Sequence, residues 1–449
     1  YSNQSSLYEV ASFGYQIPFY VANMTGSHYE MGYAYGTFFA EAILEVYNNL
    51  MYSILPNTED IDAMELFIDW QYQDFLSKQM PKDFVDEMQG VVDGATSVGM
   101  PDLGPILHRA ITLANFPGDI EANIEYLLSG LQCSHFSVWG NRTVNGDMFN
   151  GRNLDWFAGT GISQHKVLAV YHPTDGYSHL SVSFAGLVGG MTGISSNGIF
   201  TAESDSDSKL VTFEGFAWAM RIRWVMEHAQ NIDEALQLWR STNNTMGMNH
   251  MLSSAFESLS NPHPAYALET MQGYTAFFPD NDPNEIFYYA NSNPPIQMGY
   301  PIPQAVWRTN HGYDATIRKE QTFVQSPDGD SMVRYMLFHD NFVHFESTGA
   351  NAIDELIAVN ITSITGDKNN TDFYSCEEAW NGGNVISATF HSQNNTMFVA
   401  YEEGTGMNRL CACCNVYVHI DLSLWFGSAS AVPEPNIHSS SSSRSNNRS

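Results

Sequence analysis

The stretch from Gln132 to Trp156 constrains the fold of this chain more than any other. It opens with a short alternating apolar run that carries Cys133, turns at Asn145-Gly146, and returns through Gly151-Arg152-Asn153-Leu154-Asp155-Trp156. Two such runs joined by an Asn-Gly turn predict a β-hairpin, because these residues readily adopt the left-handed backbone that the turn requires. Helical spacing precedes the hairpin and strand-like patterns follow it, so it marks a boundary in the chain.

The order of the predicted elements favours one fold class, α+β. The first 130 residues are mainly helical, with periodic stretches at about 26–55, 61–79, 82–98 and 104–115. Strand-like runs dominate afterwards, interrupted by helices at about 214–229, 232–241, 329–340 and 350–358. Because the helices come in blocks and the strands outnumber them, the pattern favours stacked antiparallel sheets with helices outside over a doubly wound parallel sheet.

Composition excludes several classes of partner. The formal net charge of −31 repels phosphate backbones, so we expect no nucleic-acid binding. No run of eighteen apolar residues occurs, so the sequence predicts no membrane span. The chain has no P-loop, H-E-x-x-H, G-x-S-x-G or G-x-G-x-x-G motif, and we expect no cofactor and no metal.

Several features favour a secreted protein or one of the lysosomal lumen. The chain starts at Tyr1 without a methionine, which is compatible with removal of a signal peptide. Lysines and cysteines are few, and potential N-glycosylation sequons are many. These sequons begin at Asn3, Asn23, Asn141, Asn243, Asn360, Asn369, Asn394 and Asn447.

The cysteine count is odd. If Cys133 is a free thiol, the other four (Cys376, Cys411, Cys413 and Cys414) could form two bridges. The Cys-x-Cys-Cys cluster could instead suggest zinc, but the paired C-x₂-C spacing of zinc sites is absent. A bridge from Cys376 to one of the other three is favoured, and closing that loop would stabilise the fold by about 3–4 kcal/mol.

No single candidate residue establishes a site. A cysteine in an apolar run is more often a buried small hydrophobe than a nucleophile. Arg152 and Asp155 near a strand end commonly form a structural ion pair, and Asn310 in Trp307-Arg308-Thr309-Asn310-His311 could satisfy a turn.

Together, however, the motifs resemble those of a known family. The segment Gly26-Ser27-His28-Tyr29-Glu30-Met31-Gly32-Tyr33-Ala34-Tyr35-Gly36 is similar to the opening motif of penicillin (isopenicillin-N) acyltransferase-like proteins, which are related to choloylglycine hydrolases and acid ceramidase. Cys133 followed by Gly151-Arg152-Asn153-Leu154-Asp155-Trp156 matches the order of the family's cysteine and its Gly-[Arg/Gln]-Asn-x-Asp-aromatic strand. Three later segments resemble its Asn-x-Gly, Thr-Asn-His and Ser-x-x-Arg motifs: Ser196-Asn197-Gly198-Ile199, Thr309-Asn310-His311 and Ser331-Met332-Val333-Arg334-Tyr335.

The resemblance implies an N-terminal-nucleophile hydrolase fold, an αββα sandwich, with self-cleavage between Gln132 and Cys133. Residues 1–132 would then be a mainly helical propeptide or light subunit, residues 133–426 the catalytic core, and residues 427–449 a disordered serine-rich tail. We expect the two fragments to remain associated. The family's penicillin enzyme has glycine before its cysteine, where this chain has Gln132.

The chemistry of such a site can be stated from the residues. A free thiol has a pKa of about 8.5, so it needs a base near neutral pH. The α-amine freed at Cys133 has a pKa near 8 and would be that base. Asp155 would hold the amine, Arg152 would favour the thiolate, and Asn310 would donate its side-chain N–H to the oxyanion.

Two further residues are secondary candidates. Arg334 could bind a substrate carboxylate, although an ion-paired helix arginine is the simpler interpretation. Glu30 is more simply a structural contact between the propeptide helix and the core.

The sequence therefore predicts a self-processing amidohydrolase that cleaves linear amides of small molecules, such as N-acyl compounds, through a Cys133 thioester. An acyltransferase on the same fold is the nearest alternative, in which an amine rather than water takes the acyl group. A secreted glycoprotein that kept the fold but lost activity is the other alternative. It would show no amidase activity and no reactive N-terminal cysteine.

Overall fold

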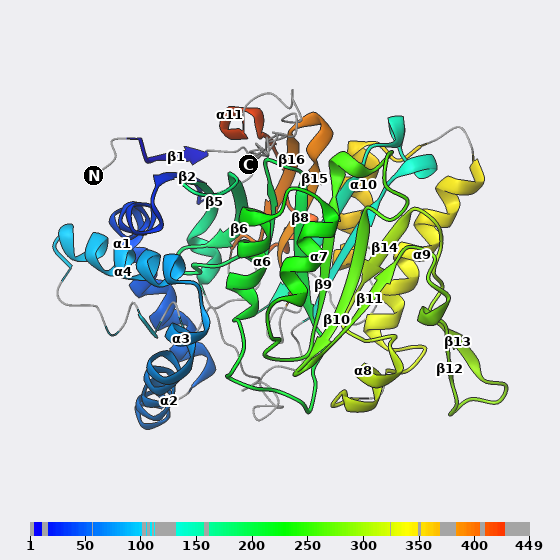
Figure 1. Ribbon diagram of the computed structural model, residues 1–449, viewed down its shortest axis with the longest axis horizontal. Coiled ribbons are helices and arrows are strands. Elements are labelled where there is room, and N and C mark those ends of the chain that lie inside the picture. The colour runs from blue at the N-terminus through cyan, green and yellow to red at the C-terminus, as the bar shows by residue number, and fades with distance from the viewer. Residues whose placement is uncertain are drawn as a thin grey trace, which may run out of the picture.

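A computed structural model of the protein describes residues 4–10, 17–55, 57–100, 105, 108–109, 112, 132–156, 161–323, 325–348, 352–368, 383–404 and 409–426. Two β-sheets stack face to face, and helices cover the outer face of each sheet (Figure 1). This four-layer arrangement is the predicted αββα sandwich. Within the described part of the chain, no helix is long and apolar enough to cross a membrane.

The larger sheet has nine strands and includes part of the N-terminal segment. Its order is β1 (Ser6–Val10), β2 (Phe19–Gly26), β5 (Lys166–Pro173), β6 (His179–Phe184), β7 (Thr192–Ser195), β8 (Ile199–Asp205), β9 (Met248–Ser254), β10 (Ala265–Met271) and β11 (Tyr274–Pro279). The strands pair antiparallel except that β2 and β5 run parallel.

The smaller sheet has six strands and is antiparallel throughout. Its order is β14 (Ala305–Arg308), β3 (Gln132–Val138), β4 (Phe149–Trp156), β15 (Gly383–His391), β16 (Thr396–Tyr401) and β17 (Val418–Asp421). A separate hairpin joins β12 (Phe287–Tyr289) to β13 (Ile296–Met298). The mainly antiparallel pairing that the sequence predicted is confirmed.

The helices fall into two groups, one on each sheet. Against the nine-stranded sheet lie α1 (His28–Ile54), α6 (Trp218–His228) and α7 (Ile232–Arg240), and α4 (Lys82–Ser97) packs on α1. Against the six-stranded sheet lie α9 (Asp330–Thr348) and α10 (Glu355–Ser363). The remaining α-helices are α2 (Thr58–Gln71), α3 (Ser77–Gln79), α8 (Ala315–Glu320) and α11 (Ser423–Phe426).

The predicted hairpin is present as β3 and β4. Asn145 and Gly146 have φ angles of +60° and +78°, the left-handed conformation that the Asn-Gly pair was expected to supply. Cys133 pairs with Leu154 across the hairpin, and His135 pairs with Arg152. Because opposite residues of a strand pair share a face, these four side chains point to the same side of the sheet.

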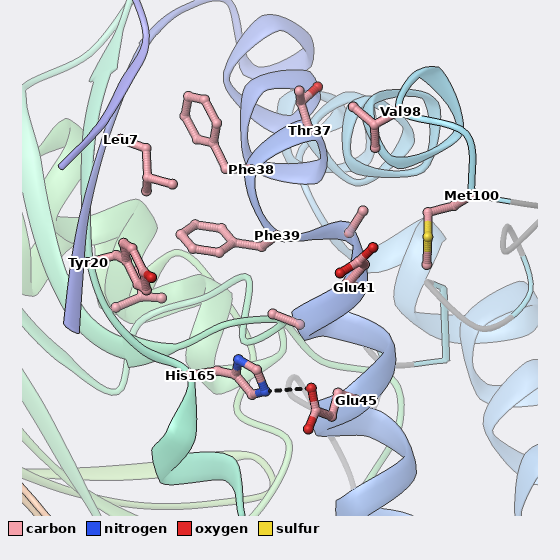
Figure 2. A pocket seen from close by; sticks show the side chains of 13 residues that line it. Leu7, Tyr20, Thr37, Phe38, Phe39, Glu41, Glu45, Val98, Met100 and His165 are labelled. Carbon is pink, nitrogen blue, oxygen red and sulfur yellow. Dashed lines mark ion pairs between the residues drawn. The ribbon is translucent and has the colours of Figure 1, made fainter. Parts of the chain in front are cut away.

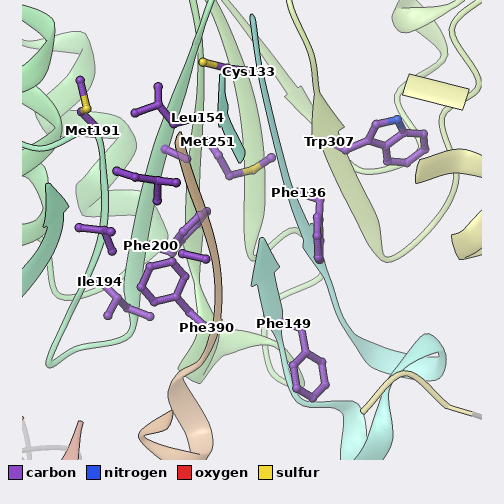
Figure 3. Close-up of a cluster of buried hydrophobic side chains, with 14 of the residues drawn as sticks. Cys133, Phe136, Phe149, Leu154, Met191, Ile194, Phe200, Met251, Trp307 and Phe390 are labelled. Atoms are coloured by element: carbon purple, nitrogen blue, oxygen red, sulfur yellow. The ribbon is translucent and has the colours of Figure 1, made fainter. Parts of the chain in front are cut away.

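The apolar core lies largely between the two sheets. The rings of Phe200 on β8 and Phe390 on β15 are 5.4 Å apart, so side chains of the two sheets interdigitate. Figure 3 shows Cys133 near Leu154 at one end of this cluster and Phe149 toward the other end. The predicted nucleophile thus lies at the end of a packed core.

The glycines of the opening motif allow α1 and α4 to pack at very short range. A Cβ on Gly32 would lie 2.0 Å from the carbonyl oxygen of Glu87, and one on Gly36 would lie 2.1 Å from that of Val91. Glu30 was expected to be a structural contact between the propeptide helix and the core, and the structure shows another role for it. It caps its own helix, since the backbone N–H of Ser27 donates to Glu30 Oε2 over 2.9 Å and Glu30 N–H donates back to Ser27 Oγ.

Some elements differ from the sequence prediction. β1, β7, β13 and α8 were not expected, α9 runs eight residues further than predicted, and α10 lies later than the helix expected at 350–358. Strand β7 was missed because its glycine-rich surroundings are typical of a turn. The structure requires glycine at position 193, because a Cβ there would lie 2.1 Å from the carbonyl oxygen of Leu180. The helix expected at 104–115 and the tail 427–449 fall mostly or wholly outside the described residues.

The predicted modification sites differ in exposure. Asn141, Asn243, Asn360 and Asn394 are exposed. Asn23 is half-buried in β2, and its side-chain oxygen is 2.8 Å from a ring nitrogen of His172. Asn3, Asn369 and Asn447 lie outside the described residues, as does Cys376, so the predicted disulfide and glycosylation stay predictions.

A buried charge cluster joins the N-terminal helices to the rest of the protein. The two ring nitrogens of His28 on α1 each lie 2.8 Å from a carboxylate oxygen, one of Glu87 on α4 and one of Glu227 on α6. Arg223 on α6 donates two hydrogen bonds to Glu87, over 2.6 and 2.7 Å, and a third to His179. Burial alone would lower the pKa of His28, but its bonds to Glu227 and Glu87 outweigh burial and raise this pKa to about 9.

The cluster gives the fold a predictable pH dependence. The pKa of His28 in the folded protein exceeds its ordinary value of 6.5, so its contribution to stability is complete below pH 6.5 and is lost as the pH rises through about 9. The pKa of Glu87 falls to about 2, because the charge of Arg223 and the bond from His28 outweigh burial; its contribution is complete above pH 4.5 and is lost as the pH falls through about 2. The two contributions are therefore both complete between pH 4.5 and 6.5.

We expect His28→Ala to lower the free energy of unfolding at pH 6 by about 3–5 kcal/mol, because it leaves Glu227 without its partner in the interior. The variant should also lose the decline in stability between pH 6.5 and 9. Urea unfolding at pH 5 to 10 checks both effects. His172→Ala is the matched control, since His172 bonds Ser178 and Asn23 rather than a carboxylate. An unchanged alkaline decline in His28→Ala would contradict the assignment.

Candidate active site

Cys133 lies at the start of β3 with its side chain between the two sheets. The residue is 5% exposed. Burial raises the pKa of its thiol to about 12, although the nearby charge of Arg152 opposes the rise. The thiol in this structure is therefore neutral at neutral pH, and it needs a nearby base before it can act as a nucleophile.

Arg152 lies on the strand beside Cys133 and extends across the space between the sheets to Glu203. Its Nη2 lies 3.3 Å from Cys133 Sγ and 2.5 Å from Glu203 Oε1. Arg152 belongs to β4 of the smaller sheet and Glu203 to β8 of the larger one, and both are buried. The Arg152 charge favours the thiolate of Cys133, whereas the Glu203 charge raises the pKa of the thiol.

Asn310 holds the backbone nitrogen of Cys133. It lies two residues after the end of β14, and its Oδ1 accepts from Cys133 N–H over 2.7 Å. Its Nδ2 donates to the carbonyl oxygen of Asp205 over 2.8 Å, and Ser331 Oγ accepts from its backbone N–H over 2.8 Å. The side-chain N–H that was expected to serve an oxyanion is thus bonded to Asp205 in this structure, and the oxyanion role stays a prediction.

Arg334 holds the other end of the same residue. From α9, its Nη1 donates to the carbonyl oxygen of Cys133 over 2.6 Å and its Nη2 to Asn310 Oδ1 over 2.9 Å. Its Nε pairs with Asp330 one helical turn earlier, over 2.8 Å. Arg334 is therefore an ion-paired helix arginine that also orients the proposed nucleophile, and its role in binding a substrate carboxylate stays a prediction.

Asp155 lies on β4 across from Gln132, next to the predicted cleavage site. Its Oδ1 accepts from Asn384 Nδ2 over 2.8 Å. Burial raises the pKa of this carboxyl to about 6, although the Arg334 charge and the Asn384 hydrogen bond oppose the rise. Asp155 therefore titrates in the mildly acidic range.

The structure brings together all five predicted residues: Cys133, Arg152, Asp155, Asn310 and Arg334. The sequence interpretation missed three partners, Glu203, Asp330 and Asn384. The four-residue spacing of Asp330 and Arg334 on a predicted helix was a usable signal, whereas no local pattern marks Glu203 or Asn384. Among the described residues, no cluster of three or more histidine, cysteine, aspartate and glutamate side chains is arranged to hold a metal ion.

A cavity of about 460 Å³ lies elsewhere in the protein, where the N-terminal segment meets the larger sheet. Figure 2 shows Phe38, Phe39 and Tyr20 on its apolar side and the ion pair between His165 and Glu45, with a nitrogen–oxygen distance of 3.1 Å. None of the five site residues lines it. The cavity is therefore separate from the candidate active site.

Comparison with known proteins identifies a matching family. The model of the acyl-coenzyme A:6-aminopenicillanic acid acyl-transferase family matches residues 142–372, just over half of the chain. The matched range begins after Cys133 and contains the other four site residues.

Individual relatives are distant. An uncharacterized protein of Archaeoglobus fulgidus is 24% identical over 235 residues, and protein dcd1B of Dictyostelium discoideum is 26% identical over 235 residues. These matches cover 49% and 48% of this chain but only 38% and 44% of the two relatives, so the chain spans less than half of their length. Among solved structures, the Caenorhabditis elegans N-acylethanolamine-hydrolyzing acid amidase ortholog is 13% identical with a TM-score of 0.38, covering 58% of this chain and 93% of that one.

The contact between Arg152 and Glu203 predicts how the charge of Glu203 changes the pKa of the Cys133 thiol. We expect Glu203→Gln to lower the pKa of Cys133, because Arg152 would then act on the sulfur without an opposing carboxylate. At pH 8 the rate of alkylation by iodoacetamide should rise roughly 3- to 10-fold, since the rate follows the thiolate fraction. Peptide mapping of Cys133 measures this rate.

The matched control is Glu402→Gln. Glu402 also forms a buried pair with an arginine, Arg409, but it does not contact Cys133. A similar acceleration in both variants would indicate general loosening of the fold rather than a local electrostatic effect.

Proposed function

Because this chain belongs to the acyl-coenzyme A:6-aminopenicillanic acid acyl-transferase family, we propose that it is a self-processing amidohydrolase with Cys133 as its nucleophile. One observation carries the proposal: three side chains converge on this residue. Arg152 contacts the sulfur, Asn310 the nitrogen and Arg334 the carbonyl oxygen. A buried cysteine that only fills space needs none of these contacts.

The first step is cleavage of the chain's own Gln132–Cys133 bond. Cys133 Sγ attacks the carbonyl carbon of Gln132 and the C–N bond breaks, with the thiol proton ending on the freed nitrogen of Cys133. The product is a thioester between Gln132 and the sulfur. Water then hydrolyses this thioester, releasing the Gln132 carboxyl group and restoring the thiol.

Cleavage changes what the nitrogen can bind. The amide of the intact chain has one hydrogen, which Asn310 accepts in this structure. A free amine has two, so a second acceptor becomes possible. Asp155 lies across the hairpin from Gln132, which supports a role as that acceptor. We therefore assign the predicted contact between Asp155 and this nitrogen to the processed enzyme.

In the mature enzyme the α-amine of Cys133 acts as the general base. It takes the thiol proton as the sulfur attacks the carbonyl carbon of a small-molecule amide, and it then protonates the leaving nitrogen. Arg152 stabilises the thiolate. The resulting thioester is hydrolysed by water, which completes the cleavage of a linear N-acyl amide.

We propose that the two fragments remain associated after cleavage. Strand β2 lies inside the nine-stranded sheet and pairs with β5 over seven residues. The buried cluster of His28, Glu87, Arg223 and Glu227 joins the same two parts of the chain. Loss of the light fragment would expose both contacts.

Transfer to an amine is the second candidate function, and the family's description as acyl-transferases favours it. The two functions share every step up to the thioester and differ in what resolves it. Supplying a primary amine during turnover distinguishes them, because a transferase yields the new amide in preference to the free acid.

Mass spectrometry of the purified protein should find a fragment that begins at Cys133. We expect Cys133→Ala to remain a single chain without amidase activity, because the attacking sulfur is absent. Ser137→Ala is the matched control: Ser137 lies on the same strand and faces the same side, and the variant should be cleaved normally. An intact wild-type chain with full amidase activity would refute self-processing.

A further inference from the structure

The cysteine-rich turn at 411–414 is not used by the mechanism, yet it is joined to the active site by one side chain. Asn384 is the second residue of β15, beside Asp155 of β4. Its Nδ2 donates to Asp155 Oδ1 over 2.8 Å, and its Oδ1 accepts from the backbone N–H of Cys413 over 2.7 Å. Asn384 is 2% exposed and Asp155 is 3% exposed.

We propose that Asn384 is a positioning residue for Asp155, and that the Cys411–Cys414 turn sets the direction of its amide through the backbone N–H of Cys413. The proposal rests on the proposed function in one respect, that Asp155 holds the amine of Cys133. The hydrogen bonds themselves do not depend on that function.

The direction of the amide follows from its two partners. The N–H of Cys413 can only donate, so it must face the Asn384 oxygen. The NH₂ group is then left to face Asp155, which accepts. In the opposite orientation, two oxygens would face each other and two N–H groups would face each other, in an interior that leaves little room for water to compensate.

The turn is anchored from a different part of the fold. Cys413 Sγ donates to the carbonyl oxygen of Gly366 over 2.7 Å, and Ser363 Oγ donates to the carbonyl oxygen of Cys413 over 2.8 Å. Ser363 is the last residue of α10, and Gly366 follows in the next turn. The backbone N–H of Cys413 is therefore held in place by contacts that do not involve Asn384.

The backbone of β15 also brings Asn384 into place. The register between β4 and β15 shifts between Asn384 and Ile386, so Val385 is an extra residue on β15. Such a bulge redirects the neighbouring side chains. Asn384 Nδ2 consequently lies near Asn153 Oδ1, at 3.3 Å, as well as near Asp155.

Several charged or titratable groups act on Asp155. Arg152 belongs to its own strand, Arg334 and Asp330 to α9, and Cys133 to the neighbouring strand β3. Asn384 adds a donor from the other neighbouring strand. Because its hydrogen bond favours the ionised carboxyl, its removal should raise the pKa of Asp155 above its value of about 6. Less Asp155 would then be ionised in mildly acidic solution.

The test measures the titration of Asp155 directly in the full-length protein. ¹³C NMR of carboxyl-labelled aspartate gives the midpoint, and Asp155→Asn assigns the signal. We expect Asn384→Ala to move this midpoint upward by about one pH unit, the usual size of a lost hydrogen bond to a carboxylate. Asn384→Asp is a second variant of nearly identical shape that can still accept from Cys413, and its added charge should move the midpoint further.

The matched control is Asn415→Ala. Asn415 follows the same turn and also buries its amide, but it donates to the carbonyl oxygen of Tyr401 and does not contact Asp155. It should leave the Asp155 midpoint unchanged. An unchanged midpoint in both Asn384 variants would overturn the proposal.

Activity provides a separate readout. For hydrolysis of a fluorogenic N-acyl amide, the acidic limb of kcat/KM should move with the midpoint. Activity of Asn384→Ala should then fall up to about tenfold at pH 5, with little change at pH 8. An upward NMR shift supports the positioning role even if the wild-type protein shows no amidase activity, which would count against the proposed function alone. A shifted midpoint in an active enzyme whose pH profile does not move would overturn the link between Asn384 and catalysis.

Discussion

A single buried charge organises the candidate active site. The guanidinium of Arg152 lies between two sheets, where an unpaired cation would cost several kcal/mol. Glu203 on the opposite sheet supplies the compensating carboxylate. Cys133 Sγ contacts the same guanidinium nitrogen, Arg152 Nη2. The pair therefore links the two sheets at the point where the chemistry is proposed to occur. A change in the packing of the sheets would move these charges and so change the pKa of the Cys133 thiol.

The sequence was most informative where a local pattern had a direct physical cause. The Asn-Gly turn required left-handed backbone and predicted the hairpin, while the blocks of helices and the excess of strands favoured stacked antiparallel sheets. The five candidate residues were proposed together because each lies in or beside a short motif of fixed order. Glu203 and Asn384 were missed because their importance arises only when β8 and β15 are placed beside β4, which no spacing along the chain reveals.

The roles of the predicted residues were harder to assign than their positions. Asn310 was expected to donate to an oxyanion, yet two donors converge on its oxygen and turn its NH₂ group toward Asp205. Arg334 was expected to be an ion-paired helix arginine, and besides its pair with Asp330 it donates to the backbone carbonyl of Cys133. In both cases the sequence identifies the side chain, and the direction of its hydrogen bonds depends on neighbours from other elements.

The parallel pairing of β2 with β5 has a consequence for a chain cut at residue 132. Before the cut, unfolding is unimolecular, and the midpoint of melting does not depend on concentration. After it, the unfolded state consists of two separate polypeptides, whose translational freedom favours dissociation in dilute solution. A protein cut at this bond would thus behave thermodynamically as a heterodimer although it was made as one chain. Its persistence then depends on how slowly an interior strand can be withdrawn from a nine-stranded sheet.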